Sequence, residues 1–230
     1  MRFEIGQEVS ERSAGPWGSR WAIEALLHQG RYCTRFLASC LQPEIEGLRG
    51  VLSVPRYDVE RWSDRRYVEV VRGRLRGELA ALSNVSARLP EPLDHFDVPL
   101  SSREISTGPG GFDCEEVVVR SLVHGQDLGT YIRPRRGLAM PSESVLLLLV
   151  RICSFLEGLH AHGRGWVFWA LTPEHIIVAP QRGFAPVFVG VGNFRMLKHG
   201  LVVDGQDPLS TYQTRGPGYA APEILAGRDV

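Results

Sequence analysis

Two neighbouring residues, Glu174 and His175, are the first candidates for chemistry in this sequence. A carboxylate beside an imidazole can move protons or bind a metal ion, and the acidic residues of the 202–207 loop could add oxygen ligands. Each side chain also has a structural interpretation, with Glu174 as a hydrogen-bonding residue and His175 as a packing residue of a loop. The pair alone does not decide between these interpretations.

Cysteine and lysine chemistry is sparse. Lys198 is the one lysine among the 26 basic residues, which removes almost every candidate for a lysine-dependent site. The four cysteines form no Cys-x-x-Cys or Cys/His cluster, so we expect neither a zinc site nor a disulfide framework, and we expect a reducing, cytoplasmic location. They are Cys33, Cys40, Cys114 and Cys153.

The overall charge is balanced, with 26 basic against 26 acidic residues in 230. A general binder of nucleic acid or of membrane surfaces would carry a strong basic excess, so we expect no nucleic-acid partner. The longest apolar run, residues 145–150, is far shorter than the ~20 residues that span a bilayer, so we expect no membrane segment. With 43% hydrophobic and 23% charged residues, the composition is that of a globular protein.

The first half of the chain has mainly β-type patterns. Residues 3–37 predict three antiparallel strands, with residues 28–31 as a hairpin turn. Residues 41–66 have no clean period and are interpreted as an insertion. Residues 72–85 predict an amphipathic helix with Glu78 near its middle. Two more strands are expected near residues 93–100 and 116–122.

The second half is predicted to be mainly helical. We expect a short helix at residues 127–132, a long and largely buried helix at 141–160, and short strands at 166–169, 176–178 and 187–189. The fold class is therefore α+β, with a β-rich lobe over residues 1–123 and a helical lobe over 124–230. The insertion at about 41–66 belongs to the first lobe.

Three separated motifs give the chain its resemblance to the protein kinases. The segment WVFWALTPEHII at 166–177 resembles the family's catalytic loop, VVHRDLKPENIL, and GPGYAAPEI at 216–224 resembles the end of the activation segment. Residues 118–128 resemble the strand and hinge that meet adenine. The resemblance implies a bilobal kinase-like fold, and the TRGPGYAAPE stretch at 214–223 favours the bacterial serine/threonine kinases.

The residues that transfer phosphate in this family are replaced here. The resemblance puts Ala170 at the place of the catalytic aspartate, so no general base is expected there. It puts His175 and Gly190 at the two metal-ligand positions, where oxygen ligands would be needed for magnesium. We therefore expect no catalytic residue, no metal and no cofactor, and any bound ATP would lack a productively placed magnesium ion.

A degenerate nucleotide site is expected at Arg35, Glu78, Arg120 and Asp127. Arg35 falls at the place of the strand lysine and could pair with Glu78, either as a structural tie or as a remnant phosphate site. Arg120 falls behind the adenine pocket and could fill it, and Asp127 could meet a ribose or cap a helix. The resemblance puts Ser10, Arg12 and Gly15 at the positions of the family's three phosphate-binding glycines. Of these three residues, only Gly15 is a glycine.

The leading hypothesis is a pseudokinase that acts in regulation or protein–protein interaction. The alternatives are a divergent serine/threonine kinase with residual ATP binding or phosphotransfer, and a scaffold whose nucleotide pocket is filled.

The sequence stops soon after Glu223, which in the family pairs with an arginine of a later helix. We therefore expect a truncated second lobe that a protein partner or another domain covers. Residues 56–76 are rich in arginine and form either a solvated face or a docking surface.

Overall fold

The computed structural model describes residues 3–11, 19–30, 32–61, 63–84, 89–100, 112–133, 141–161, 166–168, 171–179, 185–190, 194–198 and 201–202. The chain divides into two compact units. The first comprises Met1–Ser83 and Glu91–Leu122, and the second comprises Asn84–Pro90 and Val123–Val230. Both units contain strands and helices, so the protein is mixed α/β, with a β-rich first unit compatible with a kinase N-lobe.

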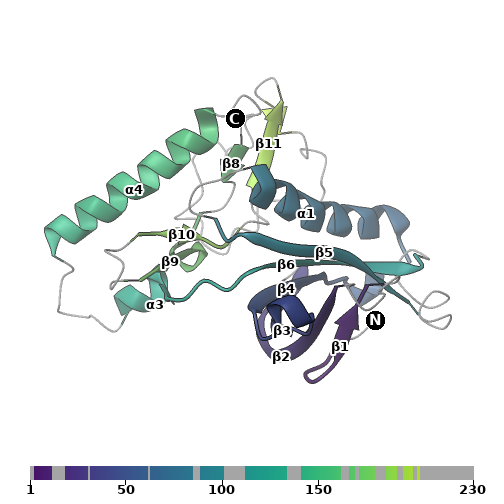
Figure 1. The fold of residues 1–230 in the computed structure, drawn as a ribbon. Coiled ribbons are helices and arrows are strands. Elements are labelled where there is room, and N and C mark those ends of the chain that lie inside the picture. Colours follow the sequence, from purple (N-terminus) through teal and green to yellow (C-terminus); the bar gives the residue numbers. More distant parts are fainter. Residues whose placement is uncertain are drawn as a thin grey trace. The chain divides into compact units, whose positions relative to one another are not determined.

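The first unit is built on a six-stranded antiparallel sheet with the order β1-β2-β3-β4-β6-β5. The helix α1 lies along this sheet (Figure 1). The three strands expected within residues 3–37 are present, and so are the two expected after the helix. The strands are β1 (Glu8–Ser10), β2 (Arg20–Gln29), β3 (Cys33–Cys40), β4 (Arg49–Pro55), β5 (Pro92–Pro99) and β6 (Cys114–Ser121).

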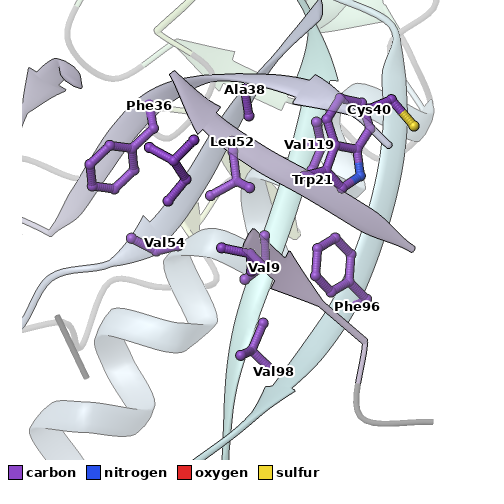
Figure 2. Close-up of a cluster of buried hydrophobic side chains, with 12 residues drawn as sticks. Val9, Trp21, Phe36, Ala38, Cys40, Leu52, Val54, Phe96, Val98 and Val119 are labelled. Carbon is purple, nitrogen blue, oxygen red and sulfur yellow. The ribbon is translucent and has the colours of Figure 1, made fainter. Parts of the chain in front are cut away.

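One face of this sheet carries the hydrophobic core of the first unit. Successive side chains of a strand alternate between the two faces, so Phe36 and Ala38 of β3 share a face with Leu52 and Val54 of β4. Figure 2 shows these side chains in one cluster with Trp21 of β2. The opposite face is left for α1 and for the polar residues described below.

The strand β4 corrects the interpretation of residues 41–66 as an insertion. Arg49–Pro55 is a buried strand that pairs with β3 on one side and β6 on the other. Only the flanking turns, with the 3-10 helices η1 (Pro43–Ile45) and η2 (Val59–Arg61), fit the description of an excursion. The pattern was obscured because the strand is buried on both faces and therefore lacks the alternation of a half-buried strand.

The helix α1 covers Arg65–Asn84 and begins seven residues before the predicted start. Its N-terminus is capped by Asp64, whose Oδ1 accepts hydrogen bonds from the backbone N–H of Arg66 at 3.0 Å and of Tyr67 at 3.2 Å. Val68 and Val71 continue the buried stripe that Leu75 and Leu82 start at the other end. The β-branched residues of this first part made the helical period less visible from the sequence.

The described residues of the second unit form two small sheets and the α-helices α3 and α4. One sheet has the order β10-β9-β7 and the other β12-β11-β8. The predicted short helix is α3 (Leu128–Ile132), and the predicted long helix is α4 (Ser142–Ala161). The strands are β7 (Gln126–Asp127), β8 (Trp166–Phe168), β9 (Ile176–Val178), β10 (Val187–Phe188), β11 (Phe194–Lys198) and β12 (Leu201–Val202), and the 3-10 helix η5 covers Pro173–His175.

The prediction that the long helix is largely buried is wrong. Leu148, Phe155 and Leu159 form its buried stripe, and Phe155 stacks on Phe188 with 3.9 Å between the ring centroids. Apolar residues surround the first half of the helix on every side, and a single stripe can cover only one of those sides. Its exposed large apolar side chains are Val145, Leu146, Leu147, Leu149 and Val150. In the described part of the chain, no helix is both long enough and apolar enough to cross a membrane.

Candidate functional site

Glu78 of α1 is the centre of a buried charged group in the first unit. Its Oε2 accepts a hydrogen bond from Nη2 of Arg35 at 3.3 Å, and its Oε1 lies 3.6 Å from Nε of Arg120. Arg35 comes from β3 and Arg120 from β6, which β4 separates. Three of the four residues predicted for the degenerate site therefore lie together, and one carboxylate faces two guanidinium groups.

Burial sets the electrostatics of this group. The Glu78 side chain is 2% exposed, that of Arg120 5% and that of Arg35 17%. Burial lowers the pKa of Arg120 to about 10, although the Glu78 carboxylate opposes the shift. Burial also disfavours the charged form of Arg35, but the carboxylate and its hydrogen bond outweigh it and raise the pKa of Arg35 above its ordinary value. Arg35 is thus the better compensated of the two cations.

The placement of Arg35 at the strand-lysine position needs correction. That placement treated residues 33–37 as the last strand before the helix, but β4 lies between them and α1 in the sequence. Ser53 of β4 is the register partner of Arg35. It is fully buried, and its hydroxyl has no hydrogen-bond partner among the described residues. The residue opposite Arg35 on the strand that leads into α1 is therefore a serine, and it cannot replace an ammonium group.

Two consecutive glutamates of β6, Glu115 and Glu116, form a second polar group that the sequence analysis missed. Glu115 accepts a hydrogen bond from the hydroxyl of Tyr57 at 2.8 Å, and burial raises the pKa of this carboxyl group. Glu116 accepts a bond from Nε of Arg76 at 2.9 Å and lies 2.9 Å from Nε2 of His95. Two acidic residues beside the Val117–Val119 run were the available signal, because a charge inside a strand needs a partner.

The arginines of residues 56–76 are largely used within the first unit. Arg72 donates to the backbone carbonyl of Cys114 at 3.0 Å, and Arg56 donates to that of Gly30 at 2.7 Å. Arg74 stacks on the ring of Tyr32 at 4.1 Å, and Arg61 pairs with Asp64 at 3.8 Å. These internal contacts favour the structural interpretation of the stretch over a docking surface.

In the second unit, Asp127 caps α3. Its Oδ1 accepts a hydrogen bond from the backbone N–H of Thr130 at 2.8 Å, and its backbone has the extended conformation of an N-cap residue. The capping interpretation of Asp127 is therefore confirmed. Gly125, two residues earlier, has φ +154°, and a Cβ there would lie 2.7 Å from the carbonyl oxygen of Val178. Only glycine fits this close approach of two backbones.

Glu174 and His175 both lie in η5. Glu174 is exposed and pairs with Arg133 at 3.3 Å. Hydrogen bonds from its own backbone and from Thr172 lower the pKa of Glu174, so it is ionised near neutral pH. The Nδ1 atom of His175 accepts a hydrogen bond from the backbone N–H of Thr172 at 3.2 Å. This bond closes a capping box around the 3-10 turn.

The imidazole of His175 lies directly against Gly190. A Cβ atom at position 190 would be 2.5 Å from Cδ2 and 2.6 Å from Cγ of the ring. The ring also packs beside Phe168, with 5.7 Å between the centroids. The two positions predicted to correspond to metal ligands are therefore neighbours, and the imidazole fills the space that a side chain at 190 would need. Among the residues that the structure describes, no three His, Cys, Asp or Glu side chains gather as a metal site.

Several predicted positions lie outside the described residues. They are Ala170 at the catalytic position, Arg12 and Gly15 of the phosphate-binding loop, the acidic residues at 204 and 207, and the 216–224 motif. Ser10, the first position assigned to that loop, is the last residue of β1.

Comparison with known proteins gives a partial likeness to one kinase. No protein-family model matches the chain. A stretch of 111 residues is 36% identical to the rhodopsin kinase GRK7 of Ictidomys tridecemlineatus. The match covers 47% of this chain but 18% of that protein, so the chain spans less than a fifth of the relative's length. The likeness is weak and points to a relationship with the protein kinases.

Proposed function

We propose that this chain is a kinase-like domain that does not transfer phosphate and acts in regulation through contacts with other proteins. The observation that carries the proposal is the packing of His175 against Gly190. In the kinase resemblance these positions hold magnesium with oxygen ligands. Here one position has no side chain, and the imidazole of the other has its Nδ1 engaged by the backbone N–H of Thr172.

The charged group around Glu78 supports the same proposal. A kinase needs a lysine that pairs with the helix glutamate and reaches the phosphates. Glu78 faces two arginines, and the strand that leads into α1 has Ser53 opposite Arg35. A guanidinium held by a buried carboxylate is a planar fork and does not reproduce a compact ammonium group.

The rival function is a divergent serine/threonine kinase with residual ATP binding or phosphotransfer. Glu174 is the residue that favours it, because its carboxylate is exposed and ionised and lies near Asp127 beside Gly129. These two carboxylates could hold a magnesium ion in place of the ligands that are missing at positions 175 and 190. The two functions differ in whether magnesium contributes to the binding of ATP.

Thermal unfolding with ATP, and with ATP plus magnesium, separates them. A ligand that binds only the folded state raises its stability by RT ln(1 + [L]/Kd). We expect magnesium to add nothing for the wild type, and no transfer of labelled phosphate to the chain or to generic acceptors. The double variant His175→Asn with Gly190→Asp restores oxygen ligands and should make any effect of ATP depend on magnesium. Phosphate transfer by the wild type that is lost in Glu174→Gln would refute the proposal.

The regulatory part of the proposal requires a partner. Five large apolar side chains exposed on α4 support association with another protein surface. Size-exclusion chromatography with light scattering tests this on the isolated chain. We expect self-association or soluble aggregation that falls when Leu146 and Leu149 are changed to serine, and a stable monomer would count against it.

A further inference from the structure

The group around Glu78 has an excess of positive charge. Arg35 and Arg120 contribute two guanidinium groups, and Glu78 contributes one carboxylate. Cys33 lies close enough to interact with all three, but burial raises the pKa of its thiol, which therefore stays neutral. Arg74, the other charged group that interacts with Cys33, is also a cation. Within the part of the chain that the structure describes, one positive charge of this group thus remains uncompensated, which is costly for side chains as buried as these.

Strand register places the donors of this group on one face of the sheet. Arg35 is the partner of Ser53, and Val51 is the partner of Arg120. Directly opposed residues share a face, and so do residues two apart in a strand. Arg35, Ser53 and Arg120 therefore all project from the face to which Glu78 of α1 is joined by its two ion pairs. Opposed side chains start about 5 Å apart and diagonal ones about 7–8 Å apart.

The hydrogen bonds of the group are incomplete. Four buried atoms of the group have no hydrogen-bond partner in the described part of the chain: Nε of Arg35, Nε of Arg120, the hydroxyl of Ser53 and Oε1 of Glu78. Three donors therefore compete for one acceptor, which lies 3.6 Å from Nε of Arg120, beyond hydrogen-bond distance. A water molecule could accept from two of these donors, but it would leave the excess charge in place. An anion would accept from the donors and also neutralise the charge.

Burial limits the size of such an anion. Ser53 is 0% exposed, and the free polar atoms are inaccessible to solvent. A phosphate or carboxylate carried by a larger molecule would need an opening to the surface. A monatomic ion is the smallest anion and needs the least room.

We propose that Arg35, Ser53 and Arg120 bind a single monovalent inorganic anion, chloride being the probe of choice, inside the first unit. The ion would accept hydrogen bonds from the two Nε–H groups and from the serine hydroxyl. It would make the fold of this unit depend on the halide concentration. The inference rests on the charge and donor count of the group, and it holds whether or not the chain transfers phosphate.

Thermal unfolding in potassium chloride and in potassium gluconate at equal ionic strength tests the proposal. Gluconate is too large for a sealed site. At a chloride concentration about ten times Kd, binding lowers the unfolding equilibrium constant about elevenfold. For a chain of this size we expect Tm to rise by about 3–6 °C. Crystals grown in bromide should show an anomalous peak among the three donors, and the absence of both effects would overturn the proposal.

Two variants and a control separate binding from general salt effects. Arg120→Met removes the excess charge and should abolish the difference between chloride and gluconate. Ser53→Ala keeps the charge, removes one donor and should weaken the difference. Arg49→Gln removes an exposed guanidinium paired with Glu24 and should leave the difference intact. An unchanged difference in Arg120→Met would refute the assignment.

A nucleotide arm distinguishes a free anion from a phosphate oxygen. We expect that ATP in gluconate does not reproduce the chloride effect. If ATP stabilises the wild type and chloride cancels that stabilisation, the donors hold a phosphate group, and the assignment to a monatomic anion is wrong. This outcome would leave the separate question of phosphate transfer to the labelled-ATP assay.

Discussion

The substitution Gly190→Ala tests whether the imidazole of His175 occupies the space beside residue 190. The new Cβ would stand 2.5 Å from Cδ2, 2.6 Å from Cγ and 3.0 Å from Cβ of His175. These atoms include the base of the side chain, so rotating the end of the ring cannot relieve the contact. The ring must move and lose its bond to the backbone N–H of Thr172.

The size of the effect follows from two opposing terms. Forcing an extra methyl group into a packed site costs about 1–3 kcal/mol. Replacing glycine by alanine where the backbone permits it stabilises by about 0.4–1 kcal/mol through the unfolded state. Gly190 is not among the described glycines with positive φ, so alanine is permitted there. We expect a net loss of about 1–2 kcal/mol, or a fall of roughly 2–8 °C in Tm.

A double-mutant cycle measured by chemical denaturation decides the matter. In the His175→Ala background the contacts with Cδ2 and Cγ are absent and the 3.0 Å contact with Cβ remains, so Gly190→Ala should become close to neutral. The coupling between the two sites should therefore exceed about 1 kcal/mol. If Gly190→Ala has the same cost in both backgrounds, the imidazole does not fill the space at 190, and the main support for the proposed function is lost.

Three further predictions concern other parts of the molecule. Glu78→Gln leaves two buried guanidinium groups without a carboxylate and should lower the free energy of unfolding by about 3–5 kcal/mol. The control Arg49→Gln removes an exposed ion pair and should change the free energy of unfolding by less than about 0.5 kcal/mol. If denaturant titrations give similar losses for the two variants, the group around Glu78 is not buried. Burial raises the pKa of Glu115 above 4.5, so the folded state binds more protons than the unfolded state, and its stability should fall as the pH rises through the raised pKa. Glu115→Gln should flatten this pH dependence in denaturation curves measured from acid to neutral pH. If the slope of stability against pH is unchanged in the variant, Glu115 is not its source. Leu148→Ala should lower the free energy of unfolding by about 2–5 kcal/mol and Leu146→Ser by less than about 0.5 kcal/mol, because the Leu148 side chain is 5% and the Leu146 side chain 62% exposed. If thermal unfolding gives equal losses of stability, both faces of α4 are covered.

Local signals predicted the elements that have one clear period or one clear cap. The leucines at 75, 79 and 82 indicated α1, and the hairpin residues 28–31 separated β2 from β3. Asp127 was recognised as a potential cap because aspartate at a helix start accepts a backbone bond. In contrast, β4 was missed because Gly50, Ser53 and Pro55 interrupt its apolar pattern, and because strand pairing is a long-range property.

The candidate site shows the same limit. The Arg35–Glu78 pair could be anticipated from the kinase resemblance, and the structure contains it. Missing β4 shifted the strand assignment, so Ser53 was overlooked and Arg35 received the place of the lysine. The contact between His175 and Gly190 joins residues 15 positions apart, and no local pattern encodes it. The paired glutamates of β6 were visible in the sequence, but their partners come from α1, from β5 and from the segment after β4.

The central position of β4 has a consequence for how the first unit folds during synthesis. Its pairing with β6 joins Gly50 to Ser121, which closes a loop of about 70 residues. During synthesis the hairpin of β2 and β3 can form early, but the middle of the sheet stays open until β6 has left the ribosome. Such non-local contacts slow folding and leave strand edges unprotected in the meantime. Chains truncated before residue 121 should therefore be trapped with an exposed β4 edge and should recruit chaperones or aggregate.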